Sequence, residues 1–193
     1  MKTNAKMMVI GLVLAMVFCY SGSTLADEGI GTDTAAAHLN FEVTIADYIL
    51  FQVGSSGSID TIIFQPDTSD IITPTTINGT GGDLTGGRVT VRLLSNSSSV
   101  AITETNDGGG SGLVGSVSGN ISYASILAAD DNGGTGGTGI TPPQLTDAGG
   151  NVTPTMTGAQ NINTSWTYTY RHNGVQPTAG SYTGEVTYTA AIP

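Results

Sequence analysis

Short runs of alternating apolar and polar residues dominate the chain, and segments rich in glycine, proline and asparagine separate them. The alternation is clearest at residues 39–45, 88–94 and 165–171. A period of two residues is that of a β-strand with one buried face. Beyond the first 26 residues, no segment combines a 3.6-residue apolar period with helix caps, and no repeat recurs. The pattern therefore predicts an all-β fold of the sandwich type rather than a solenoid.

The first alternating run, residues 39–45, is bordered by two segments of different character. A small, polar leader precedes it at residues 27–38, and residues 48–53 follow as a run that is apolar on both faces. Apolarity on both faces predicts an interior strand for residues 48–53. The 39–45 run either completes the protein's own core or fills the core of a neighbouring copy, and the pattern leaves both open. Its apolar face consists of Leu39, Phe41, Val43 and Ile45.

Further strand candidates follow along the chain. Pro74 restricts residues 70–77 to an edge strand or a bent loop, because proline cannot donate to a ladder. Residues 88–94 and 100–105 flank a polar turn and are expected to pair as a hairpin. The remaining candidates are residues 58–64, 113–129, 151–157, 165–171 and 181–190.

The alternation also predicts which side chains face inward. Residues 88–94 are expected to bury three apolar side chains and to expose both arginines. The aromatic residues of 165–171 alternate strictly, which favours core packing over a surface that stacks on sugars. In residues 181–190 Tyr182, Val186 and Tyr188 share a face. The predicted core positions are Val89, Val91, Leu93, Trp166, Tyr168 and Tyr170.

The N-terminus has the form of an export signal. Lys2 and Lys6 precede an apolar run at residues 7–18, which is short for a membrane span. Small residues at Thr24 and Ala26 predict cleavage after Ala26. The only cysteine would leave with the signal, so stability must come from burial and strand pairing instead of disulfides.

Charge excludes two classes of partner. After cleavage three arginines remain against all 15 acidic residues. Such an excess of negative charge argues against binding to nucleic acid and against insertion or docking at an anionic membrane. The composition suits an exported, surface-exposed protein.

Residue types for catalysis or metal binding are scarce. His38 and His172 are interpreted as solvated surface residues, and two separate histidines do not supply a zinc site or a nucleophile–base pair. Asp130 and Asp131 have the right oxygen chemistry for calcium, but the spacing is not that of a calcium loop, so a plain loop is favoured. We therefore expect no enzymatic activity, no cofactor and no metal.

Two segments resemble subunits of chaperone–usher fimbriae, in particular colonization-factor-type and spore-coat-U-like pilins. Residues 41–53 (FEVTIADYILFQV) are similar to the donor strand, the break and the first body strand of that family. Residues 177–189 (PTAGSYTGEVTYT) resemble its closing Gly-x-Tyr-x-Gly turn and strand. Asp47 stands where members often have proline, and the glycine-rich middle of the chain matches no part of the pattern.

The resemblance implies an immunoglobulin-like β-sandwich that lacks one strand and is completed by donor-strand exchange. It divides the chain into a signal peptide (1–26), a flexible leader (27–38), a candidate donor strand (39–46) and a pilin-like domain (47–193). The donor residues would be Leu39, Phe41, Val43 and Ile45, with Tyr182, Val186 and Tyr188 at the rim of the groove that receives them. The partners would be other copies of the chain or related pilins, a periplasmic chaperone and an outer-membrane usher. The protein would be located first in the periplasm and then at the cell surface. The alternative is a self-complete secreted β-sandwich that binds carbohydrate or matrix.

Overall fold

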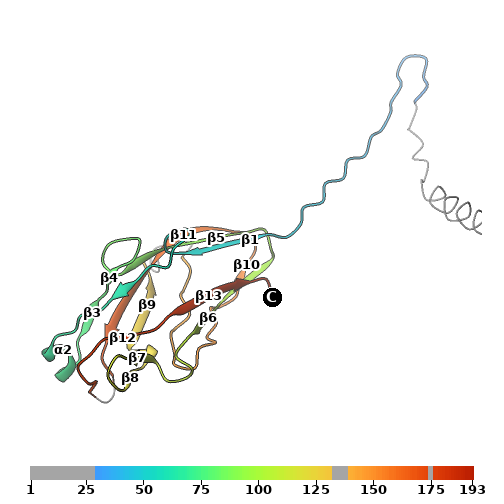
Figure 1. Cartoon of the computed structure of the whole chain (residues 1–193). Coiled ribbons are helices and arrows are strands. Elements are labelled where there is room, and N and C mark those ends of the chain that lie inside the picture. Colours follow the sequence, from blue (N-terminus) through green and yellow to red (C-terminus); the bar gives the residue numbers. More distant parts are fainter. Residues whose placement is uncertain (1–28, 132–138, 174–175) are drawn as a thin grey trace, which may run out of the picture. The chain divides into compact units, whose positions relative to one another are not determined.

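The computed structural model describes residues 29–131, 139–173 and 176–193 (Figure 1). The predicted signal peptide at 1–26 therefore lies outside the described residues. The chain divides into two units, Met1–Ile45 and Ala46–Pro193. In the described part, no helix is long and apolar enough to cross a membrane. The first unit is considered separately below, and the second contains all the strands.

The first sheet is antiparallel, and β11 is its central strand. Its members are β1 (Ile49–Val53), β3 (Thr76–Asn78), β5 (Arg88–Ser95), β9 (Ile126–Asp130) and β11 (Gln160–Arg171). Trp166 of β11 pairs with Val89 of β5 on one edge and with Asp130 of β9 on the other. β1 pairs with β5 and lies at the end of this sheet. Gly54 terminates β1 with a positive φ of 74°, which glycine adopts at little cost.

The second sheet is antiparallel around β6 (Ser99–Asn106), which pairs with β10 (Met156–Thr157) and β13 (Val186–Ala191). Two small sheets and two short helices complete the fold. One small sheet pairs β2 (Ile62–Ile63) with β4 (Thr80–Gly81). The other consists of β7 (Leu113–Gly115), β8 (Asn120–Ile121) and β12 (Tyr182–Thr183). The helices are the α-helix α2 (Thr68–Ile72) and the 3₁₀ helix η2 (Tyr123–Ser125).

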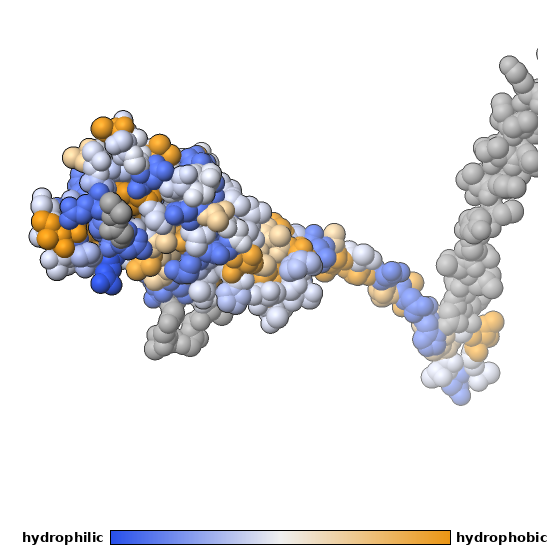
Figure 2. Space-filling model, turned by 90° about the horizontal axis from the view of Figure 1, so that it is seen from below, coloured by the Kyte–Doolittle hydropathy of each residue, from blue (hydrophilic) through white to orange (hydrophobic). Residues whose placement is uncertain are grey.

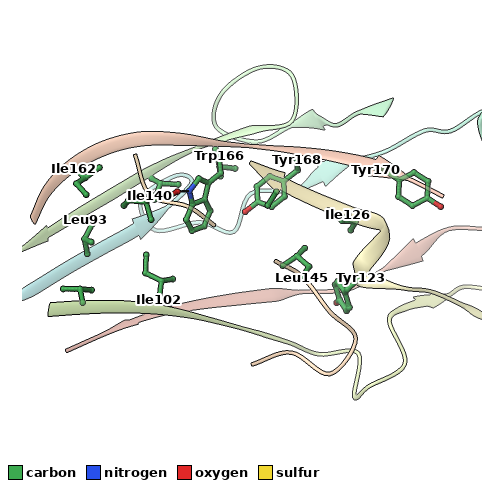
Figure 3. Close-up of a cluster of buried hydrophobic side chains, with 14 residues drawn as sticks. Leu93, Ile102, Tyr123, Ile126, Ile140, Leu145, Ile162, Trp166, Tyr168 and Tyr170 are labelled. Atoms are coloured by element: carbon green, nitrogen blue, oxygen red, sulfur yellow. Dashed lines mark hydrogen bonds between the residues drawn. The ribbon is translucent and has the colours of Figure 1, made fainter. Parts of the chain in front are cut away.

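The core lies between the inward faces of the two main sheets (Figure 3). Trp166 is fully buried, and its indole nitrogen donates a 2.6 Å hydrogen bond to the carbonyl of Ile140. Fully burying an aliphatic side chain stabilises a fold by about 1.5–3 kcal/mol, so these sheets supply most of the folding energy. The buried apolar residues of the four long strands are Val89, Val91, Leu93, Val100, Ile102, Ile126, Ala128, Ile162, Trp166, Tyr168 and Tyr170.

Several predictions from the sequence are confirmed. The described part of the chain is all-β with almost no helix. Val89, Val91 and Leu93 are buried, whereas Arg92 is exposed. Trp166, Tyr168 and Tyr170 belong to the core rather than to a sugar-binding surface.

Two predictions about strand pairing are wrong. β5 and β6 do not form a hairpin, because residues 96–98 carry the chain from the first sheet to the second, and each strand pairs elsewhere. The run 48–53 is not an interior strand, since β1 lies at the edge of its sheet and Ile49 and Leu50 are exposed. The first two residues of β1, Ile49 and Leu50, are thus left exposed.

Two local predictions also differ from the structure. Residues 70–77 include most of α2, and only their last two residues belong to β3, which lies at the edge of its sheet as predicted. Asp67 caps this helix by accepting hydrogen bonds from the amides of Ser69 and Asp70, and the Asp70 side chain accepts one from the Asp67 amide. Such a reciprocal cap is a helix-start signal that the sequence analysis missed. Residues 181–190 are divided into β12 and β13 rather than forming one strand.

Candidate subunit-docking edges

Two neighbouring strands each leave one edge unpaired. Among the described residues, β1 pairs only with β5, and β13 pairs only with β6. The two strands belong to different sheets and lie in contact with each other. Each open edge presents backbone N–H and C=O groups that another strand can use. We call the unpaired edges of β1 and β13 the open edges.

Core side chains are incompletely covered along the open edges. Phe51 and Val53 of β1 and Val186, Tyr188 and Ala190 of β13 pack against the core but are only partly buried. By contrast, Val91 and Ile102 on the adjoining inner strands are 0% exposed. The core is therefore less well covered at the open edges than in the middle of each sheet.

The apolar side chains of the segment 39–45 are exposed. Leu39, Phe41, Val43 and Ile45 are 76, 86, 83 and 74% exposed. The segment has no strand partner. Figure 2 shows hydrophobic and hydrophilic residues alternating along this extended part of the chain. Four large apolar side chains on one face of an unpaired segment would lower the free energy by becoming buried.

The residues expected at the groove rim lie in two different sheets. Val186 and Tyr188 are on β13, at an open edge. Tyr182 is on β12, which pairs with β7, and its hydroxyl donates a 2.6 Å hydrogen bond to the carbonyl of Thr178. The strand is interrupted at Gly184, where a Cβ atom would lie 2.0 Å from the Tyr123 hydroxyl.

Tyr188 connects the open edge with the core. Its ring packs edge-on against Trp166, with 5.0 Å between centroids, and its hydroxyl accepts a hydrogen bond from Tyr168 at 3.0 Å. Burial raises the pKa of Tyr188 to about 12, although the hydrogen bond from Tyr168 opposes the shift. Tyr188 is therefore a neutral phenol at physiological pH. Sequence reasoning identified Tyr188 but missed Phe51 and Val53, because β1 was assigned to the interior.

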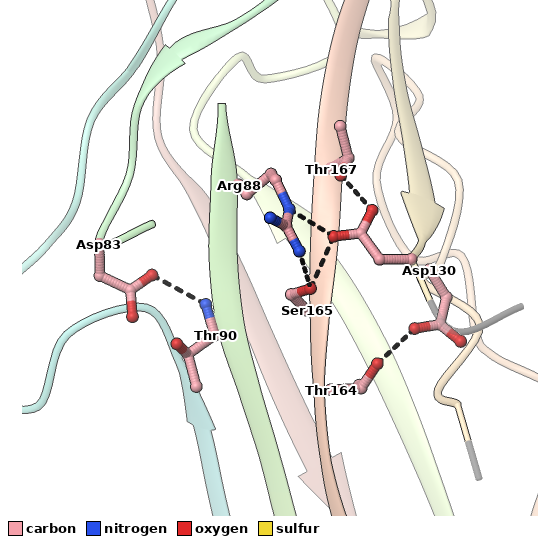
Figure 4. A network of polar contacts seen from close by, with 8 residues as sticks. Asp83, Arg88, Thr90, Asp130, Thr164, Ser165 and Thr167 are labelled. Atoms are coloured by element: carbon pink, nitrogen blue, oxygen red, sulfur yellow. Dashed lines mark hydrogen bonds and ion pairs between the residues drawn. The ribbon is translucent and has the colours of Figure 1, made fainter. Parts of the chain in front are cut away.

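The two carboxylates considered for calcium, those of Asp130 and Asp131, form hydrogen bonds with other side chains of the protein (Figure 4). The Asp131 carboxylate forms an ion pair with Arg88 at 2.6 Å and accepts hydrogen bonds from Ser165 and Thr167. Burial alone would raise the pKa of Asp131, but these three partners hold it below its usual value. Thr164 donates to Asp130 at 2.6 Å. Among the described residues no cluster of three or more possible ligands could hold a metal ion, and residues 132–138 lie outside them.

The interpretation of His172 as a solvated residue is wrong. Its side chain is 6% exposed, and its Nδ1 lies 3.2 Å from the Tyr170 hydroxyl. β11 brings it to the interior because the chain continues past Arg171 with the alternation of the strand. His38 lies in the exposed leader, far along the chain from His172.

Comparison with known proteins gives no relative. A scan against protein-family models and searches of curated proteins and of solved structures found no match for this chain.

Proposed function

We propose that this chain is a structural or adhesive subunit of a bacterial surface fimbria. The 39–45 segment of one copy would pair with the open edges of β1 and β13 in the next copy. One observation carries the proposal: the two neighbouring edges are unpaired while an alternating segment of the same chain exposes its whole apolar face. Strand addition of this kind takes its affinity from backbone hydrogen bonds and its specificity from alternate side chains.

In this proposal the folded unit is an immunoglobulin-like sandwich that lacks one strand. The two antiparallel sheets around a common core support it, as does the connection that carries the chain from β5 in one sheet to β6 in the other. A strand added at the open edges would cover Phe51, Val53 and Val186 at the margin of the core.

Energetics favour an intermolecular strand of this size. Burying Leu39, Phe41, Val43 and Ile45 would contribute about 1.5–3 kcal/mol for each side chain. Ordering the segment and losing translational freedom would offset part of that gain. New ladder hydrogen bonds with an open edge would contribute further.

A head-to-tail contact of this kind does not close on itself. The donor segment and the open edges are different surfaces, so each added copy leaves one of each free, and a fibre grows. Before assembly the open edges would invite aggregation. A periplasmic chaperone that covers them and an outer-membrane usher that releases them are therefore the partners we propose. The subunit would pass through the periplasm to the cell surface.

The test is whether the apolar face of residues 39–45 drives assembly. Residues 27–193 are refolded at increasing concentration and examined by sedimentation and electron microscopy. We expect concentration-dependent polymers, which Phe41→Ser combined with Val43→Ser abolishes. The matched control is Asn40→Ser combined with Thr44→Ser, which changes the opposite face of the same strand and should still polymerise.

A second measurement addresses the open edges directly. A synthetic peptide of residues 39–45 is added to the Phe41→Ser, Val43→Ser variant, and its melting temperature should rise by several degrees. A monomer at all concentrations that the peptide does not stabilise, and whose own 39–45 segment resists protease, would contradict the proposal. That result would instead support a self-complete secreted domain that binds carbohydrate or matrix.

A further inference from the structure

The side chain of Asn96 holds the residues that directly follow the 39–45 segment. Its Nδ2 donates a 3.0 Å hydrogen bond to the carbonyl of Ala46, and its Oδ1 accepts a 2.8 Å hydrogen bond from the amide of Tyr48. The last ladder pair of β1 and β5 is Ile49 with Ser95. Asn96 thus continues that ladder for one more step, with a side-chain amide in place of a peptide group.

This pair of hydrogen bonds requires an extended backbone at residues 46–48. In an extended chain the carbonyl of residue i and the amide of residue i+2 point to the same side, as those of Ala46 and Tyr48 do toward Asn96. One planar amide group can bridge the two only at the separation they have in a strand. A turn at Asp47 would break at least one of the hydrogen bonds.

Asn96 itself is held in place by buried neighbours. Ser95 and Ser97 are 1% and 4% exposed, and the amide of Ser97 donates to the Ser95 hydroxyl at 3.1 Å. Ser95 is the last residue of β5, and Ser97 belongs to the connection between the two sheets. The Asn96 amide therefore projects from a fixed part of the fold toward the start of β1.

The extended link limits what the 39–45 segment can reach in its own molecule. To lie beside β1 in the same copy, the segment would have to turn back in a hairpin, and short hairpin loops take two to five residues. With residues 46–48 held extended, the turn would have to use residues from the C-terminal half of the segment. Ile45, and with a longer loop Val43 as well, would then be in the loop, so fewer of the four apolar side chains would remain to cover the core.

We propose that Asn96 is a positioning residue that prevents self-insertion and so directs the 39–45 segment to a second copy of the chain. This inference rests on the fimbrial function proposed above. According to this inference, the Asn96 side chain determines whether the 39–45 segment inserts into its own copy or into another copy. Asn96 lies outside both the donor segment and β13.

The experiment measures whether the segment is protected in monomers. Residues 27–193 are refolded at low and high concentration, monomers and polymers are separated, and chymotrypsin cleavage at Phe41 is followed in each fraction. In the unsubstituted chain we expect cleavage in monomers and protection in polymers. Asn96→Ala should raise the protected share of monomers by about two- to tenfold for each hydrogen bond lost. Asn96→Asp keeps the acceptor for Tyr48 but loses the donor to Ala46, so its effect should be intermediate.

Two further variants bracket the result. Asn163→Ala removes an exposed asparagine from β11 and should behave as the unsubstituted chain does. Ala46→Asn combined with Asp47→Gly introduces a strong hairpin turn and should give protected monomers even with Asn96 present. If Asn96→Ala matches Asn163→Ala, or if the turn variant gives no protected monomer, the inference is wrong although polymers still form. If the unsubstituted chain forms no polymers, the proposed function itself fails.

Discussion

Tyr188 lies directly opposite Glu104 in the ladder between β13 and β6, yet its hydroxyl bonds to Tyr168 and not to the Glu104 carboxylate. Glu104 is 0% exposed, and neither of its carboxylate oxygens has a hydrogen-bond partner among the described residues. An ionised carboxylate that is buried without a partner is unfavourable. The strand next to the open edge therefore carries a destabilising group at the centre of its sheet.

Replacing Glu104 should stabilise the folded unit. Glu104→Leu removes the buried carboxyl group, which has no hydrogen-bond partner, and keeps most of the volume, so we expect the free energy of unfolding at neutral pH to rise by about 1–3 kcal/mol. Glu104→Gln leaves a polar group in place and should give a smaller gain. Both are measured by urea denaturation followed by circular dichroism.

Glu185→Gln is the matched control, because it replaces a glutamate at an exposed site in the loop before β13. Its effect should stay within about 0.5 kcal/mol. A loss of stability in Glu104→Leu would mean that the carboxylate contributes to the fold in spite of its burial.

The alkaline limit of stability should depend on Tyr188. Its pKa is raised from 10.0 to about 12, so the folded state favours the neutral phenol. This contribution is complete below pH 10 and is lost as the pH rises through about 12. The pKa values of Tyr123, Tyr168 and Tyr170 are raised as well, so absorbance at 295 nm should show Tyr188 ionising together with them, above the exposed tyrosines. Tyr188→Phe should reduce the amplitude of that late step by the share of one tyrosine. Tyr48→Phe, at an exposed tyrosine, is the control and should leave the late step in place.

The acid limit should depend on Asp107. The amide of Glu185 and the hydroxyl of Tyr123 donate to its Oδ1 at 2.9 and 2.8 Å, and these hydrogen bonds hold the pKa of Asp107 below 3.8. A lowered pKa stabilises the folded state above the unfolded value, and this contribution is lost as the pH falls through the folded value.

Asp107→Asn should therefore be less stable than the unsubstituted chain at neutral pH, and the difference should shrink below about pH 4. Melting temperatures between pH 2 and pH 7 would test this. Asp33→Asn changes an acidic residue of the leader, outside the folded unit, and should leave the fall of the melting temperature in acid unchanged. A constant difference at every pH would show that Asp107 acts through geometry and not through its charge.

The sequence was sufficient for the class of fold and for the faces of the longest strands. In β5 and β11 the alternation is strong. The side chains that are buried there, such as those of Val91 and Trp166, are the ones that the two-residue period selects. Pairing was less predictable because it depends on distant contacts. The turn at residues 95–99 looks like a hairpin loop, but it crosses between sheets because Val100 and Ile102 bury against the opposite side of the core.

The candidate site was predictable only in part. The alternation in residues 39–45 marked an apolar face, and the structure leaves that face exposed. The edge position of β1 gave no local signal, since a run that is apolar on both faces is typical of interior strands. The role of Asn96 could not be predicted from the sequence either, because it depends on hydrogen bonds with Ala46 and Tyr48, which are far away along the chain.

Trp166 should be the most costly aromatic residue to replace. It is fully buried, contacts Tyr188 edge-on, and ties the segment that contains Ile140 to β11 through its indole N–H. Trp166→Phe leaves the Ile140 carbonyl without its donor and opens a small cavity, so we expect a loss of about 2–4 kcal/mol in the free energy of unfolding. Far-ultraviolet circular dichroism must follow the transition because the chain has no other tryptophan. Tyr182→Phe removes a hydrogen bond from a partly exposed ring and should cost less than about 1 kcal/mol. Similar losses in the two variants would show that the Trp166–Ile140 contact adds little, and that the two sheets alone hold β13 against the core.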